Sequence, residues 1–228
     1  MHTDLFLNNE WRPAASGERF EVVNPATEEV IAEVAAAAPS DVDDAVAAAR
    51  ACLEGDAWRS LSGRKRGALL YQAADLLEQR LGDVARLETL HNGKPLFESK
   101  IDVSMTIETL RYYAGWADKI TGSTIPVDGP FFTYTLREPV GVVAAIVPWN
   151  FPLNLASWKF APALAVGCTV ILKPASETPL TALAMAEIMQ QAGFPPGAFN
   201  VVTGSGSTVG AQLVRHPGVD KIAFTGST

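Results

Sequence analysis

After Pro139 the chain alternates between short apolar runs and helix-like segments, and this alternation restricts the fold more than any other feature. The apolar runs are VGVVAAIVP, TVILKP, FNVVTG and DKIAFTG. Runs this short and this continuously apolar are typical of strands that are buried on both faces. Strands that alternate with helices form parallel sheets, so residues 140–228 are predicted to adopt a doubly wound, Rossmann-like α/β fold.

The first 120 residues carry extended segments followed by helical periodicity. Ser40 is expected to cap a first helix, because serine accepts hydrogen bonds from the free N–H groups of a first turn. Further helices are expected over residues 64–81 and over residues 97–120, with Ile120 at the end of an apolar stripe. Residues 1–120 are therefore predicted to form strands and then a helical layer.

Residues 121–139 return to an extended pattern around an Asp-Gly turn. The edges of such a hairpin must be covered or paired, and pairing with another subunit is a common solution. We interpret the segment as an oligomerisation arm, and an ordinary surface hairpin is the alternative.

Composition limits the classes of partner. The chain has 228 residues and a formal net charge of -7, with acidic and basic residues intermixed. This charge argues against nucleic acid and against an anionic membrane surface, so small molecules are the expected ligands. No apolar stretch is long enough to span a bilayer, and the N-terminus lacks an export signal, so a cytoplasmic location is expected. Three scattered histidines and two distant cysteines predict no metal site.

Two positions near the expected carboxyl ends of the strands could bind a ligand. The loop TGSGSTVG, with Gly206 and Gly210, follows a strand and opens a helix, where free N–H groups favour a phosphate. A tight strand-to-helix turn explains the same glycines. Lys173 ends the strand TVILK and could donate to ribose hydroxyls or to a phosphate, or could simply extend into solvent.

Asn150, in the stretch VPWNFPL, has two candidate roles. Its side chain could cap the helix that follows, or its amide could face a substrate, and an asparagine can do both because it accepts and donates. Cys52 and Cys168 lie in apolar surroundings and are predicted to be core residues rather than nucleophiles.

Several blocks of the sequence together resemble the NAD(P)-dependent aldehyde dehydrogenases. They are YYAGWADKITGSTIP, FTYTLREPVGVVAAIVPWNFPL, ALAVGCTVILKPASETPL, GFPPGAFNVVTG and DKIAFTGST, and the resemblance covers essentially all of the chain. The resemblance implies oxidation of a small-molecule aldehyde to a carboxylic acid with NAD or NADP. The chemistry would proceed through a thiohemiacetal and a thioester on a cysteine, in a homo-oligomeric enzyme.

The resemblance also implies roles for residues of this sequence. Asn150 matches the asparagine that donates to the developing oxyanion. Lys173 would meet the adenosine ribose, and Gly206 and Gly210 would border the adenine. The cofactor cleft would further include Ile146, Val147, Pro148 and Trp149, and the FTGS turn of Phe224, Thr225, Gly226 and Ser227 near the pyrophosphate.

Two departures from the family pattern carry expectations of their own. Ser176 stands where NAD-preferring members commonly have a glutamate, so NADP should be tolerated and even preferred. The family's nucleophilic cysteine and general base belong after Thr228, so we expect a C-terminally truncated cofactor-binding portion that is inactive alone. The alternative is a naturally short, non-catalytic module that binds a nucleotide or a subunit.

Overall fold

Four parallel strands form the centre of the main sheet, as the sequence predicts. The computed structural model describes residues 1–227. The four strands are β7 (Val142–Ile146), β8 (Thr169–Lys173), β9 (Phe199–Val201) and β10 (Lys221–Phe224), in the order β10-β7-β8-β9. β7 and β8 are buried along their whole length, which explains why their sequences are continuously apolar and do not alternate.

Two strands from the N-terminus extend this sheet beyond β9. β1 (Leu5–Leu7) pairs antiparallel with β9 through Phe6 and Val201, and β2 (Glu10–Arg12) pairs antiparallel with β1. β3 (Arg19–Val23) and β4 (Val30–Ala35) form a separate hairpin. The sequence predicts strands in this region, but it does not predict that two of them join the parallel sheet.

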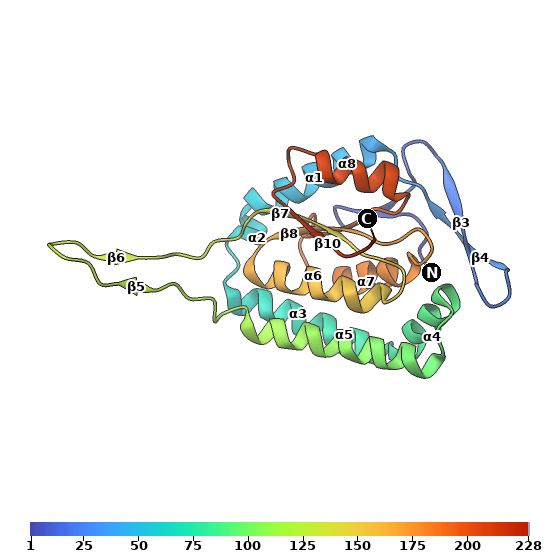
Figure 1. Cartoon of the computed structure of the whole chain (residues 1–228), viewed down its shortest axis with the longest axis horizontal. Helices are drawn as coiled ribbons and strands as arrows, with labels where there is room; N and C mark the ends of the chain where they lie inside the picture. Colours follow the sequence, from blue (N-terminus) through green and yellow to red (C-terminus); the bar gives the residue numbers. More distant parts are fainter. Residues whose placement is uncertain (228) are drawn as a thin grey trace.

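Helices cover the sheet in layers (Figure 1). On one face lie α1 (Pro39–Glu54), the π-turn η1 (Gly206–Gly210) and α8 (Ala211–Arg215). On the other face lie α6 (Pro152–Val166) and α7 (Leu180–Gln191). The predicted helical layer consists of α3 (Gly63–Gln79), α4 (Leu81–Asn92) and α5 (Leu96–Trp116), which pack on α6 and α7, while the short α2 (Asp56–Arg59) follows α1.

Two predicted helix ends are wrong. α1 begins at Pro39, one residue before the predicted cap Ser40, and its N-cap is Ala38. Ala38 has no side chain that could cap the helix, and the carboxylate of Asp41 in the first turn accepts from the N–H of Ala38 at 2.8 Å. α5 ends at Trp116, and Ile120 is 41% exposed, so Ile120 does not extend the apolar stripe.

The segment predicted as an arm extends far from the body of the molecule (Figure 1). Its strands, β5 (Thr124–Ile125) and β6 (Thr133–Tyr134), form only two residue pairs. Phe131 and Phe132 near its tip are 73% and 77% exposed. The role of this hairpin in oligomerisation stays a prediction.

Hydrogen bonds to Asp220 join the start of β7 to the start of β10. The N–H of Val142 donates to Asp220 Oδ2 at 2.7 Å, and the Asp220 N–H donates to the Val142 carbonyl at 3.0 Å. Arg50 of α1 forms an ion pair with the same carboxylate. Gly141 has a φ of 128° and lies against Asp220, so a side chain at this position would overlap with the carboxylate.

We expect Gly141→Ala to destabilise the chain by about 1–3 kcal/mol, because alanine strains this backbone conformation and displaces Asp220. Urea unfolding monitored by circular dichroism measures the change. Gly82→Ala is the matched control, because Gly82 lies in the first turn of α4 and an added Cβ would meet no atom within 4 Å. That variant should be neutral or more stable by up to about 1 kcal/mol. Equal unfolding free energies for the two variants would contradict the prediction.

Candidate functional site

The path of the chain reverses at β7, which forms a topological switch point. We call the region outside the carboxyl ends of the strands at this point the crevice. From β7 the chain proceeds through β8 to β9 with α6 and α7 on one face of the sheet. It then returns through η1 and α8 on the other face and places β10 on the opposite side of β7 (Figure 1). Open α/β sheets bind ligands outside the carboxyl ends of the strands at such a switch point. The loops after β7 and β10 flank this crevice.

Main-chain hydrogen bonds hold the predicted loop residues at the crevice. The Thr225 N–H donates to the Ile146 carbonyl, and the Val147 N–H donates to the Lys173 carbonyl, both at 3.1 Å. The ends of β10, β7 and β8 are thereby joined in one row. The structure brings this part of the predicted set together: Ile146, Val147, Pro148, Trp149, Lys173, Phe224, Thr225, Gly226 and Ser227.

Lys173 does not extend into solvent. Its side chain is buried, with the residue 3% exposed, and Nζ donates to the Pro174 carbonyl at 2.8 Å. Burial lowers the pKa of Lys173 to about 8, and nearby Glu177 opposes this shift. An ammonium has three donors, and one hydrogen bond is present among the described residues, so a ribose hydroxyl or an anion could satisfy the others.

The glycine loop lies beside Lys173. The Cδ and Cε atoms of Lys173 would lie 3.8 Å from a Cβ added at Gly210, so the lysine stem packs against this turn. Ser176 Oγ donates to the Gly204 carbonyl at 3.0 Å and ties the loop after β8 to the loop after β9. A Cβ at Gly206 would meet no atom within 4 Å, so its backbone is open to a ligand. A buried donor and an open backbone fit a nucleotide.

Asn150 does not cap α6. The helix begins at Pro152, its N-cap is Phe151, and no side-chain cap bond forms there. The N–H of Leu153 donates to Glu88 Oε1 at 3.4 Å, so a carboxylate from α4 takes the place of the predicted cap. Asn150 is exposed in the turn after β7. Its amide is therefore at the carboxyl side of the sheet and not in the protein interior.

A buried polar cluster that the sequence analysis missed supports the starts of α6 and α7. His91 Nδ1 accepts from the N–H of Leu180 at 3.2 Å, and the Thr181 hydroxyl donates to Glu88 Oε2 at 2.7 Å. The side chains of Glu88 and His91 are 0% exposed. Helix α4 thus caps two helices that begin near the crevice. Local sequence holds no signal for this, because the partners are more than sixty residues apart.

Other unpredicted residues lie along α6. Lys159 Nζ donates to Thr225 Oγ1 at 2.6 Å, and burial lowers the pKa of Lys159. Phe151, the N-cap residue of α6, and Trp158 within α6 are 43% and 52% exposed. Trp158 and Lys159 also line a cavity at the base of the hairpin arm. The sequence predicts a helix-like segment here, and it does not distinguish exposed from buried aromatic residues.

Neither cysteine belongs to this site. Cys52 packs in the core, and burial raises the pKa of its thiol to about 11. Cys168 is buried at the amino end of β8, opposite the crevice. Its raised pKa makes the Cys52 thiol a poor nucleophile at neutral pH. Among residues 1–227 no group of three histidine, cysteine or acidic side chains could hold a metal ion, and no helix is long and apolar enough to cross a bilayer.

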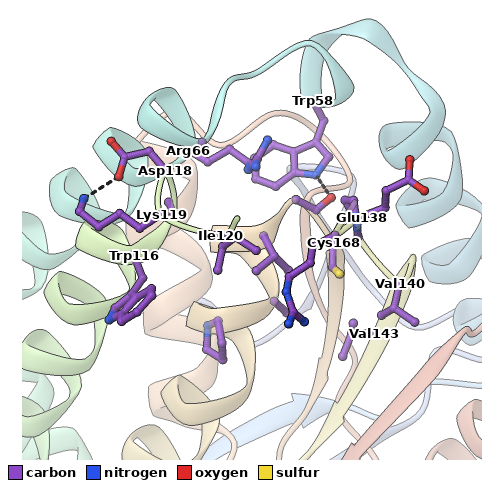
Figure 2. Close-up of a pocket in the computed structure, with 18 of the residues that line it drawn as sticks. Trp58, Arg66, Trp116, Asp118, Lys119, Ile120, Glu138, Val140, Val143 and Cys168 are labelled. Atoms are coloured by element: carbon purple, nitrogen blue, oxygen red, sulfur yellow. Dashed lines mark hydrogen bonds and ion pairs between the residues drawn. The ribbon is translucent and has the colours of Figure 1, made fainter. Parts of the chain in front are cut away.

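A cavity of about 1340 Å³ lies elsewhere, at the base of the hairpin arm (Figure 2). Figure 2 shows Trp58, whose indole N–H donates to the Gly167 carbonyl, together with Arg66 and Trp116. None of the predicted site residues lines this cavity. The candidate functional site is the crevice, because the buried lysine, the open glycine backbone and the exposed asparagine all lie at the carboxyl ends of the parallel strands.

Comparisons with known proteins identify relatives of the whole chain. The model of the aldehyde dehydrogenase family matches residues 11–228. The chain is 54% identical over 226 residues to the mitochondrial aldehyde dehydrogenase of Rattus norvegicus, covering 98% of this chain and 44% of that protein. It is 52% identical over 229 residues to retinal dehydrogenase 2 of Gallus gallus, covering 100% and 44%.

Solved structures agree with this assignment. An NAD+ complex of an aldehyde dehydrogenase from Bacillus cereus superposes with a TM-score of 0.98 at 48% identity, covering 100% of this chain and 46% of that one. The chain therefore spans a little less than half the length of the relatives it matches.

Replacing the buried ammonium tests the electrostatics of Lys173. We expect Lys173→Met to be more stable than the wild type near pH 7, by about 1–3 kcal/mol. Between about pH 8 and the ordinary lysine pKa of 10.5, the unfolded wild type holds more protons than the folded one. The stability of the wild type should therefore rise with pH relative to the variant, and the gap should shrink.

Urea unfolding of both proteins at pH 7 and pH 9.5 measures this gap. The exposed Lys100 provides a control, since Lys100→Met should produce no difference that depends on pH in this range. A gap for Lys173→Met that stays constant between the two pH values would contradict a lowered pKa.

Proposed function

The chain belongs to the aldehyde dehydrogenase family, and from this premise we propose that it forms the cofactor-binding part of an enzyme that oxidises an aldehyde to a carboxylic acid with NAD or NADP. In this proposal residues 1–120 and 140–228 build one cofactor-binding unit, and residues 121–139 form the arm. The matched relatives act as a guide to the reaction, because two of them are named as aldehyde and retinal dehydrogenases.

One observation carries the proposal: a buried lysine and an open glycine backbone meet at the carboxyl ends of parallel strands. Lys173 would donate to the adenosine ribose, and Gly206 and Gly210 would allow the adenine side of the nucleotide to approach the backbone. The remaining cofactor surface would come from the two loops that flank the crevice: Ile146, Val147, Pro148 and Trp149 after β7, and Phe224, Thr225, Gly226 and Ser227 after β10. The NAD+ complex of the similar Bacillus cereus enzyme supports this choice of cofactor.

The chemistry of the proposed reaction is divided between cofactor and protein. A bound nicotinamide dinucleotide supplies the hydride acceptor. Asn150 would donate its amide N–H to the oxygen that becomes negative as the carbonyl is attacked, and one such donor contributes about 3 kcal/mol to catalysis. The exposed position of Asn150, free of a capping role, supports this assignment. The exposed faces of Phe151 and Trp158 would shield the aldehyde from water.

The hairpin arm supports a proposal about assembly. The arm exposes Phe131, Phe132 and Tyr134 away from the core, where they pack on no residue of the main body among those the structure describes. We propose that these side chains and the free strand edges are covered by another subunit in a homo-oligomer.

Ser176 leads to a prediction about cofactor choice. The wild-type chain should bind NADP at least as well as NAD, because a serine beside the ribose does not repel a 2′-phosphate. We expect Ser176→Glu to weaken NADP binding at least roughly tenfold and to strengthen NAD binding, because the carboxylate repels the phosphate and accepts from the 2′-hydroxyl. Isothermal titration with each cofactor measures both affinities.

Ser176→Ala separates charge from the loss of the hydroxyl. This variant removes the hydrogen bond to the Gly204 carbonyl but adds no charge, so the ratio of NADP to NAD affinity should stay close to that of the wild type. A wild-type chain that binds NAD tightly and rejects NADP would overturn the prediction.

The proposal as a whole is tested by an assay for aldehyde-dependent formation of NAD(P)H. The 228-residue chain alone should be inactive, since its two thiols are buried and lie outside the crevice. A longer polypeptide that contains it, of the length of the relatives, should be active. Cofactor binding without activity in both forms would instead favour a non-catalytic nucleotide-binding module, and the absence of cofactor binding would refute the proposed site.

A further inference from the structure

We propose that Lys94 is a positioning residue that sets the orientation of the Asn150 amide. This inference rests on the proposed function, and it assigns a task to a side chain that touches neither cofactor nor substrate in that proposal. Lys94 lies in the link between α4 and α5, 56 residues before Asn150 in sequence. Three contacts hold its ammonium group against the turn that carries the amide.

The contacts of Lys94 span two elements. Nζ donates to the Asn150 main-chain carbonyl at 2.9 Å and forms an ion pair with the Asp102 carboxylate of α5. It also lies 4.3 Å from the centroid of the Phe151 ring, within the range of a cation–π contact. One ammonium therefore connects α5 to the backbone of Asn150 and to the side chain that follows it.

Burial makes this connection stiff. The side chains of Lys94 and Asp102 are only 9% and 5% exposed, so water cannot easily replace either partner. Burial raises the pKa of the Asp102 carboxyl, and the hydrogen bond from Lys94 opposes that shift. Since a buried charge without its partner is strongly unfavourable, the ammonium is fixed in place, and with it the carbonyl it holds.

Neighbouring residues hold the same turn from the same side. Asn92 Nδ2 donates to the Trp149 carbonyl, and Glu88 Oε1 accepts from the Leu153 N–H. The segment 88–94 thus fixes the main chain on both sides of Asn150. Asn150 itself does not cap α6. Among these three contacts, the one from Lys94 reaches the Asn150 peptide itself.

A fixed carbonyl restricts the direction of the amide. The Lys94 contact fixes the plane of the peptide between Asn150 and Phe151, and the Asn92 contact fixes the preceding plane. Together they determine where the Asn150 Cβ points. Groups that stabilise a transition state must be held to within a fraction of an ångström, so loosening this turn should lower turnover without removing the amide.

The kinetic test uses an active polypeptide that contains this chain. We expect Lys94→Met to lower kcat by roughly tenfold to a hundredfold, while KM for NAD(P) changes by less than about twofold. Lys100→Met, an exposed lysine in α5, is the matched control and should leave both constants unchanged. In an Asn150→Ala background, Lys94→Met should cause no further loss, because its effect passes through the amide.

A second measurement uses the 228-residue chain without cofactor. Hydrogen exchange in peptides covering residues 149–155 should be faster in Lys94→Met than in the wild type or in Lys100→Met. Since Lys94→Met leaves the Asp102 carboxylate buried alone, Lys94→Met/Asp102→Asn removes that charge and should show the same faster exchange in a folded chain.

The outcomes separate the inference from the function. The role of Lys94 would be refuted if Lys94→Met lowered kcat equally in the wild-type and Asn150→Ala backgrounds. It would also be refuted if hydrogen exchange at residues 149–155 were unchanged in both Lys94→Met and Lys94→Met/Asp102→Asn. An active enzyme in which Asn150→Ala has no effect would refute the oxyanion assignment instead. If the longer polypeptide has no activity, the proposed function fails, and hydrogen exchange alone decides whether Lys94 holds the turn.

Discussion

The pairing of β7 with both β8 and β10 is the interaction on which the rest of the structure depends. Within the part that the structure describes, the connecting helices change faces of the sheet at β7: α6 leads to β8 on one face, and η1 and α8 lead to β10 on the other. The carboxyl end of β7 therefore faces two loops that approach from different sides. The residues assigned to the site lie close together because β8 and β10 flank this strand.

Continuous hydrophobic runs made the central sheet predictable. β7 and β8 are buried on both faces, and a chain segment with that environment must be apolar throughout. The position of Lys173 was informative for the same reason, since a lysine at the end of such a strand has few environments available. Its burial and its contact with the glycine turn depend on how β8 and β9 meet, which local sequence does not encode.

The starts of α1 and α6 were less predictable because residues other than the expected caps bind there. Ser40 and Asn150 both have suitable side chains, yet neither caps its helix. The Asp41 carboxylate accepts from the N–H of the preceding Ala38, and Glu88 of α4 accepts from the N–H of Leu153 at the start of α6. Glu88 thereby satisfies a first-turn N–H that a local asparagine could also satisfy, whereas Asp41 accepts from the N–H of the N-cap residue. Because Glu88 binds the start of α6 in place of Asn150, the asparagine amide is available for another partner.

The pairing of β1 with β9 joins segments that lie on opposite sides of the hairpin arm in the sequence. The arm is exposed and has only two residue pairs, so a protease would cut there first. A cut near Gly129 would leave one piece with β1 and the helical layer and another with all four parallel strands. Because β1 belongs to the sheet of the second piece and α5 packs on α6, the pieces should remain associated as a nicked complex. Covalent continuity at the arm is thus not what holds this molecule together.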